Sequence, residues 1–157
     1  MKRLCLILLF FSSLTLTENA WAETDIKTMF QWVCREMKVD HNFSLVPELP
    51  EIIEMPERDF YSLVSKFSVI RRSFGNKVDS IVAIYQPREN KIYLIKGTPE
   101  RYLVHELVHF VQFKIKKIFP EEADFKDVAT RRIIKELEIE ARLLELHWEK
   151  NRERAQD

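Results

Sequence analysis

Glycine occurs only twice among the 157 residues of this chain, and proline only six times. A chain with so few of these residues has little material for tight turns and irregular loops, so we expect it to consist mostly of regular helices and strands. The same composition argues against a repeat array or a low-complexity chain. Apolar residues make up 46% of the sequence and charged residues 32%, which is typical of a globular protein with a packed core.

The first 22 residues have the three parts of a secretory signal peptide. A basic start over residues 1–3 precedes an apolar run over residues 4–11, and a polar stretch ends in Ala20-Trp21-Ala22. This apolar run is too short to span a bilayer, which needs about 20 apolar residues. An uncleaved anchor helix is the alternative. We expect cleavage after Ala22, export to the periplasm or the medium, no stable membrane insertion afterwards, and one domain over residues 23–157.

Removal of the signal segment changes the charge and the cysteine count. Loss of Lys2, Arg3 and Glu18 leaves 23 of the 25 basic and 24 of the 25 acidic residues. This balance produces no net field that would attract nucleic acid or anionic lipid. Cys5 is also removed, so Cys34 cannot form an internal disulfide, and its apolar helical surroundings predict burial as a small hydrophobic residue. The domain must then obtain its stability from its core or from a metal ion.

The spacing of apolar residues predicts the order of the helices and strands. Apolar residues repeat at helical intervals in four segments, namely 25–37, 56–67, 99–117 and 127–152. Runs rich in β-branched and aromatic residues predict strands, namely a short one at 52–53 and a hairpin over 80–86 and 91–96. The charged tail over residues 149–157 is expected to fray. These elements together predict an α+β domain.

Two histidines, His105 and His109, lie four positions apart in the predicted helix over residues 99–117. Thr98 precedes this segment and is its expected N-cap. Residues i and i+4 lie above one another on a helix, so both imidazoles can bind one Zn²⁺. Glu106 is rotated by about 100° from His105, beside the ion, where a carboxylate can take a proton from a coordinated water. The pattern predicts a zinc site with a catalytic carboxylate. The alternative is two ordinary helix histidines without a metal.

The motif His-Glu-x-x-His after a β-hairpin, followed by an acidic helix, resembles the zincin fold of metallopeptidases. The run HELVHFVQ over residues 105–112 is similar to small, mostly uncharacterised bacterial proteins of this type. This resemblance implies a minimal zincin-like α+β domain with a hairpin or small sheet, an active-site helix and a long C-terminal helix. It also implies that residues 91–96 form the edge strand beside the cleft, where an extended peptide can pair.

The third metal ligand distinguishes the zincin subtypes. A metzincin would have glycine at position 112 and histidine at position 115, whereas this chain has Gln112 and Ile115, so that subtype is excluded. In gluzincins the next helix supplies a glutamate, and Glu138-Ile139-Glu140-Ala141 resembles their E-x-x-A segment, in which the first glutamate binds the metal. The resemblance therefore implies Glu138. A helical-wheel count instead places Glu140 nearer the centre of the apolar stripe, so both residues remain candidates.

Other residues are candidates for supporting roles. Tyr102 and His147 could each donate a hydrogen bond to an anionic intermediate, although such residues are more often structural. Gln112 lies one turn after His109 and could orient that ligand. Arg142 and Glu145 are interpreted as solvated charges on the last helix.

These observations predict a zinc-dependent hydrolase, specifically a metallopeptidase with His105, His109 and Glu138 as ligands and Glu106 as the general base. Its expected partner is a peptide or protein substrate in extended form. The alternatives are a non-catalytic zinc-binding interaction module of zincin fold, and a structural protein that pairs through its last helix. A structural zinc site is usually closed by four ligands that commonly include cysteine. Three nitrogen and oxygen ligands leave one position open, which favours catalysis.

Overall fold

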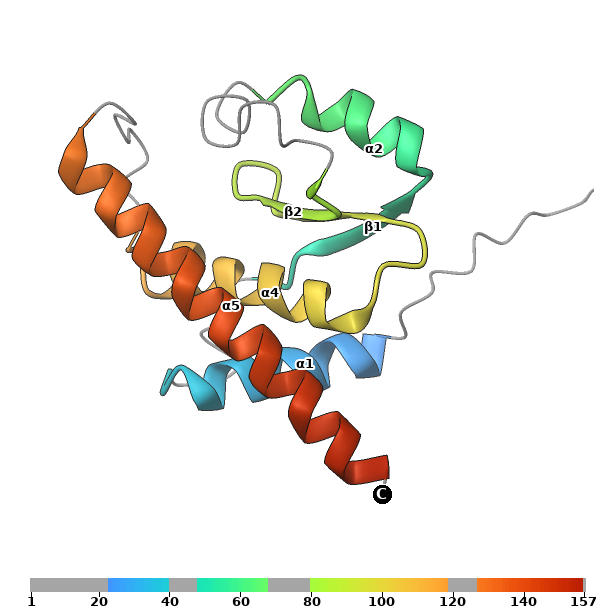
Figure 1. Ribbon diagram of the computed structural model, residues 1–157, viewed down its shortest axis with the longest axis vertical. Coiled ribbons are helices and arrows are strands. Elements are labelled where there is room, and N and C mark those ends of the chain that lie inside the picture. The colour runs from blue at the N-terminus through green and yellow to red at the C-terminus, as the bar shows by residue number, and fades with distance from the viewer. Residues whose placement is uncertain (1–22, 40–47, 68–79, 119–126, 157) are drawn as a thin grey trace, which may run out of the picture.

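The structure is a computed structural model, and it describes residues 23–39, 48–67, 80–118 and 127–156 (Figure 1). The predicted signal segment lies outside the described residues. The described helices and strands follow one another in the order α1 (Glu23–Glu36), β1 (Glu51–Met55), α2 (Glu57–Val64), β2 (Ala83–Gln86), β3 (Lys91–Ile95), α4 (Glu100–Phe110), the π-helical turn η2 (Val111–Ile115) and α5 (Val128–Gln156). This set of helices and strands confirms the predicted α+β class.

The sheet has three strands in the order β1-β3-β2, with β1 parallel and β2 antiparallel to β3. The prediction that residues 91–96 form an edge strand is therefore wrong, because β3 is the central strand. The physical reason is pairing at both edges, because β1 and β2 each form a hydrogen-bonded ladder with β3. The central strand is also buried on both faces. Ile92 and Leu94 lie in the core on one side, whereas Tyr93 is buried on the other side against Phe60 and Val64 of α2. The edge strand next to the predicted site is β2.

The helices cover the two faces of the sheet. In Figure 1, α2 lies above the strands, α4 lies below them, α1 lies below α4, and α5 crosses α4 obliquely. The larger core is formed where α1, α4 and one face of the sheet meet, and α5 adds Ala141 to it. Cys34 is fully buried in this core, as predicted, and burial raises the pKa of its thiol to about 11. No helix in the described ranges has an apolar stretch long enough to cross a bilayer.

The helix that carries the two histidines differs from the prediction at both ends. Its N-cap is Pro99 and no side chain caps it, whereas the backbone N–H of Thr98 donates to the carbonyl of Ile95. After Phe110 the helix continues as the π-helical turn η2, in which Lys116 N–H donates to the carbonyl of Val111 at 2.9 Å. π-Helical turns are rare in proteins, and those that occur are often found at functional sites.

The C-terminal helix is longer than the sequence predicts. It continues to Gln156, so residues 149–156 are helical and the expected fraying is not observed. Ion pairs with the first turn of α4 explain this length. Glu149 accepts a hydrogen bond from Arg101 at 2.5 Å, and Arg152 pairs with Glu100. These contacts hold the last turns of α5 against α4.

Candidate metal centre

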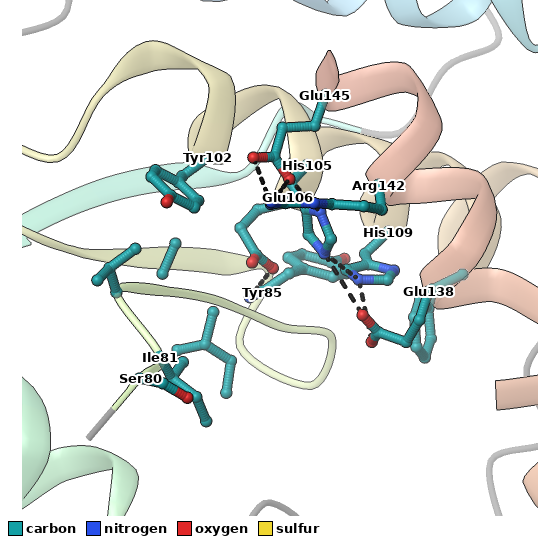
Figure 2. Close-up of a pocket in the computed structure, with 14 residues that line it drawn as sticks. Ser80, Ile81, Tyr85, Tyr102, His105, Glu106, His109, Glu138, Arg142 and Glu145 are labelled. Atoms are coloured by element: carbon teal, nitrogen blue, oxygen red, sulfur yellow. Dashed lines mark hydrogen bonds and ion pairs between the residues drawn. The ribbon is translucent and has the colours of Figure 1, made fainter. Parts of the chain in front are cut away.

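The two histidines face a cleft of about 400 Å³ between three parts of the fold (Figure 2). The segment 80–85, which includes most of β2, forms one wall, the middle of α5 forms the opposite wall, and α4 forms the floor. We call this space the site cleft. Its polar lining includes His105, Glu106, His109, Tyr102, Glu138, Arg142 and Glu145.

Three side chains bring their polar atoms to one point in the site cleft. The Nε2 atoms of His105 and His109 are 3.2 Å apart. Oε2 of Glu138 lies 3.5 Å from Nε2 of His105, and Oε1 lies 3.4 Å from Nε2 of His109. A tetrahedral zinc ion with bonds of about 2.0–2.2 Å separates its ligand atoms by about 3.3–3.6 Å. The three residues therefore fit a zinc ion in both donor type and spacing.

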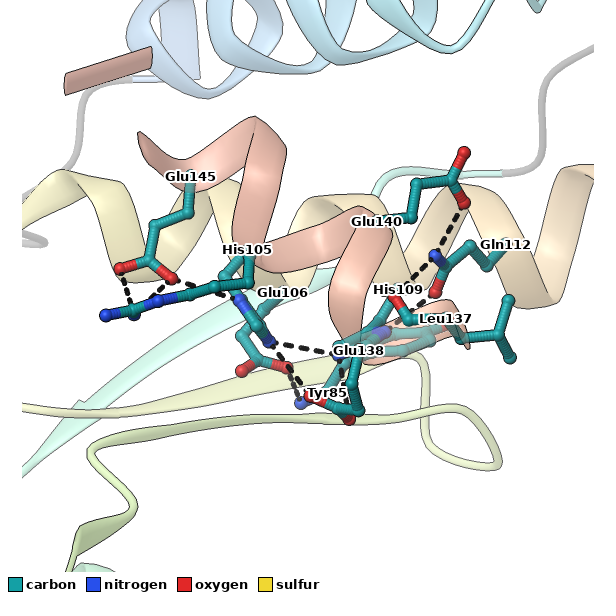
Figure 3. Close-up of polar contacts among 10 residues, drawn as sticks. Tyr85, His105, Glu106, His109, Gln112, Leu137, Glu138, Glu140 and Glu145 are labelled. Carbon is teal, nitrogen blue, oxygen red and sulfur yellow. Dashed lines mark hydrogen bonds and ion pairs between the residues drawn. The ribbon is translucent and has the colours of Figure 1, made fainter. Parts of the chain in front are cut away.

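The other candidate for the third ligand, Glu140, does not face the histidines. Its Oε2 accepts a hydrogen bond from Nε2 of Gln112 at 2.9 Å (Figure 3). Its Oε1 lies 3.3 Å from Nζ of Lys116. The wheel count favoured Glu140 because it located the centre of the apolar stripe. The histidines instead face the edge of that stripe on which Glu138 lies.

The side chain of Gln112 determines the tautomer of His109. Its Nε2 donates to the carbonyl of Leu137 at 3.1 Å and to Glu140, so its Oε1 is the atom that faces His109. That oxygen lies 2.8 Å from Nδ1 of His109. An amide oxygen can only accept, so Nδ1 must carry the proton. In the neutral ring, Nε2 then presents a lone pair to the site cleft.

The side chain of Glu145 has the same effect on His105. Its Oε2 lies 3.2 Å from Nδ1 of His105, and Nη1 of Arg142 donates to both carboxylate oxygens at 2.6 and 2.7 Å. Burial by itself raises the pKa of this carboxyl, but the hydrogen bonds from His105 and Arg142 lower it below its usual range. Glu145 is therefore ionised and accepts the Nδ1 proton, which leaves the lone pair of His105 on Nε2.

Two neutral imidazoles with lone pairs 3.2 Å apart repel each other unless a cation lies between them. A proton can take that place. Burial alone lowers the pKa of His105, but hydrogen bonds to Glu138 and Glu145 raise it to about 10. Burial acts to raise the pKa of Glu138, but its hydrogen bonds with His105 and His109 lower it well below its usual range. A divalent metal ion would satisfy all three groups at once.

The carboxylate of Glu106 lies between the histidines and the sheet. Its Oε2 accepts a hydrogen bond from the backbone N–H of Tyr85 at 2.7 Å (Figure 2). Only 6% of the residue is exposed, and burial raises the pKa of its carboxyl above the usual value. A carboxylate with a raised pKa is a stronger base and can hold a proton during a reaction.

The two candidates for a hydrogen-bond donor to an anionic intermediate lie in different places. Tyr102 lines the site cleft, and its hydroxyl accepts a hydrogen bond from Nη2 of Arg101 at 3.2 Å. His147 is outside the cleft, since its Nδ1 lies 3.6 Å from Glu36 of α1 and its ring packs against Trp32. A role for His147 in the site is therefore not supported.

Two residues interpreted from the sequence as solvated charges belong to the site. Glu145 is only 1% exposed, and Arg142 lines the site cleft. Glu145 lies seven residues after Glu138, which is two helical turns along the same face. That spacing was the signal in the sequence that could have identified it.

A scan against models of known protein families, a search of curated proteins and a search of solved structures each find no match to this chain. Support for a function therefore comes from the residues of the site and from the motif that contains them.

Proposed function

We propose that this protein is a zinc-dependent hydrolase, specifically a metallopeptidase of zincin-like fold. His105, His109 and Glu138 are the metal ligands in this proposal, and Glu106 is the general base. The observation that carries it is the convergence of the Nε2 atoms of both imidazoles and the carboxylate of Glu138, with contacts of 3.2 to 3.5 Å between them. Nitrogen and oxygen donors of this kind suit zinc, and three protein ligands leave the fourth position that a catalytic site needs.

The side chains around the site have distinct tasks in this proposal. Zinc, when bound, supplies a Lewis acid and lowers the pKa of a water ligand to about 7. The carboxylate of Glu106 would accept a proton from water and return it to the leaving amine, and its raised pKa suits both tasks. The hydrogen bond from Tyr85 keeps the carboxylate of Glu106 at the wall of the cleft. Gln112 and Glu145 keep the ligand nitrogens in the required tautomer.

The outer edge of β2 supports a peptide as the substrate. Val82 accepts a hydrogen bond from Ile95 of the central strand, whereas the N–H of Tyr85 points away from that strand toward Glu106. Hydrogen-bonding direction alternates along an antiparallel strand, so the N–H and C=O of Ala83 also face the site cleft. An extended peptide can add to such an edge and bring its backbone over the metal ligands.

Metal analysis and one substitution test the proposal. We expect the purified protein to contain about one zinc per chain, because the site offers one set of three ligands. Glu106→Gln should retain the zinc but lower peptide hydrolysis by about 100-fold or more, since it removes the general base. Activity is measured on a mixed peptide library by mass spectrometry.

Glu136→Gln is the matched control, and it should retain both zinc and activity because Glu136 lies on the same helix but pairs with Arg132 outside the site cleft. A protein that stays metal-free after dialysis against zinc contradicts the metal site. Equal behaviour of wild type and Glu106→Gln on every peptide contradicts the enzyme and favours a non-catalytic zinc-binding module.

A further inference from the structure

Arg142 extends from α5 into the site cleft, one helical turn after the ligand Glu138 (Figure 2). Among the residues that the structure describes, it is the only lysine or arginine that lines this cleft. Its side chain is 56% exposed, although it is paired with a carboxylate that is 1% exposed. The guanidinium is thus anchored at one end and open to the cleft at the other.

The anchoring uses only one nitrogen of the guanidinium. Nη1 donates to both oxygens of Glu145. Within the described part of the chain, Nε and Nη2 of Arg142 take part in no hydrogen bond. These two nitrogens form an edge that matches the two oxygens of a carboxylate, and bidentate pairs of this kind are among the stronger hydrogen-bonded contacts. Because Glu145 already holds the group in place, less side-chain entropy is lost when a ligand binds.

The charges in the site cleft are also suited to an anionic ligand group. Glu106, Glu138 and Glu145 supply three negative charges when ionised, which one divalent ion and Arg142 would neutralise. A ligand carboxylate would therefore meet Arg142 without a net repulsive field. Arg142 lies four positions after Glu138 on α5, which is about 6 Å of helix and about the length of two residues of extended peptide.

We propose that Arg142 binds a carboxylate of the substrate, so that the site cleft selects peptides with a carboxylate within about two residues of the cleaved bond. This inference rests on the proposed function, because the ligand must reach the metal and Arg142 together. The carboxylate is either the C-terminus of the peptide or an acidic side chain. Arg142 is then a specificity-determining residue.

Two small hydroxamates test the inference without any measurement of catalysis. The monohydroxamate of succinic acid carries a metal-binding group and a carboxylate, and the hydroxamate of succinamic acid has the same shape with a neutral amide in place of the carboxylate. Their affinities for the zinc-loaded full chain are measured by calorimetry. We expect wild type to bind the carboxylate probe about 10- to 100-fold more tightly than the amide probe. R142Q should remove this preference, and R142K should retain part of it.

The preference is a ratio, so any general weakening of the metal site by R142Q affects both probes and cancels. R132Q is the matched control, because Arg132 lies on the same helix and pairs with Glu136 outside the cleft. It should retain the full preference. A preference that persists in R142Q, or that is absent in wild type, overturns the role of Arg142 and leaves the metal site standing. Failure of both probes to bind the zinc-loaded protein shows that the metal has no open position for a ligand, and it overturns both this inference and the proposed catalytic site.

Two hydroxamate-capped dipeptides distinguish the sources of the carboxylate. One ends in a free C-terminal carboxylate, and the other carries an aspartate side chain and an amidated C-terminus. The probe that loses about tenfold or more of its affinity in R142Q identifies the group that Arg142 recognises. If neither probe loses affinity, the inference is overturned.

Discussion

At the scale of single residues, the two imidazoles of the site differ in what holds their Nδ1 atoms. His105 contacts the ionised carboxylate of Glu145, whereas His109 contacts the neutral amide of Gln112. A carboxylate raises the basicity of the imidazole more than an amide does, and so strengthens the bond from Nε2 to a metal. Glu145 should therefore contribute more to metal affinity than Gln112, although neither residue contacts the ion.

The substitution Glu145→Gln tests this difference. It retains the shape of the side chain but removes the charge that supports His105. We expect zinc affinity to fall by about 10- to 100-fold, measured by competition with a chromophoric chelator. Glu149→Gln is the control, because Glu149 lies one turn further along α5 and pairs with Arg101 outside the site cleft. Unchanged zinc affinity in Glu145→Gln would show that Glu145 serves only to balance the charges of Arg142 and Arg101.

At the scale of elements, the site depends on how closely α5 approaches α4. Glu138, Arg142 and Glu145 lie at intervals of four and three residues, so one face of α5 presents all three to the site cleft. Ala141 lies beside this face and is fully buried in the core that α4 shares. Its small side chain permits the close contact that brings Glu138 to within 3.5 Å of the two histidines.

A larger side chain at position 141 should therefore lower the zinc affinity, although residue 141 is not itself a metal ligand. We expect Ala141→Leu to destabilise the fold by about 1–3 kcal/mol through overpacking. It should also lower zinc affinity, because α5 must move away from α4. Denaturant unfolding measures the free energy of unfolding, and chelator competition measures the affinity. Ala129→Leu, on the exposed first turn of α5, should change neither quantity. Wild-type zinc affinity in Ala141→Leu would refute this account.

At the scale of the whole molecule, the metal would connect two parts of the chain that are far apart in sequence. His105 and His109 belong to α4, which packs on the sheet, and Glu138 belongs to α5, which packs across α4 (Figure 1). A ligand that binds only the folded state stabilises it, by about 2.7 kcal/mol at 100 times its dissociation constant. Zinc should therefore raise the melting temperature.

The gain in melting temperature should depend on pH. In the metal-free protein the pKa of His105 is raised to about 10, so the bound proton stabilises the fold below about pH 6.5 and this stabilisation is lost as the pH rises through 10. Zinc must displace that proton, so its affinity rises with pH. We expect a larger zinc-dependent shift of the melting temperature at pH 8 than at pH 6, measured by scanning calorimetry.

The variant His109→Ala provides the control for this experiment, since it lacks one ligand and should show no shift with zinc at either pH. A shift in wild type that is equal at both pH values would contradict the competition between proton and metal. A shift that is as large in His109→Ala would show that zinc binds elsewhere.

The sequence alone determined the types and order of the elements, because the spacing of apolar residues is a local property that each helix or strand must satisfy by itself. It also determined that His105 and His109 share one face, since the helix sets the relation of residues i and i+4. The position of β3 at the centre of the sheet required the tertiary structure, because strand order depends on pairing between distant segments.

The tertiary structure also decided which glutamates face the histidines. Glu138, Glu140 and Glu145 all lie on one helix, and the rotation of α5 against α4 selects among them. Glu138 and Glu145 face the site cleft, whereas Glu140 contacts Gln112. That rotation results from packing around Ala141 and from the two ion pairs at the end of α5, which join residues 48 and 52 positions apart. Local periodicity cannot specify such contacts, because they depend on where the rest of the chain lies.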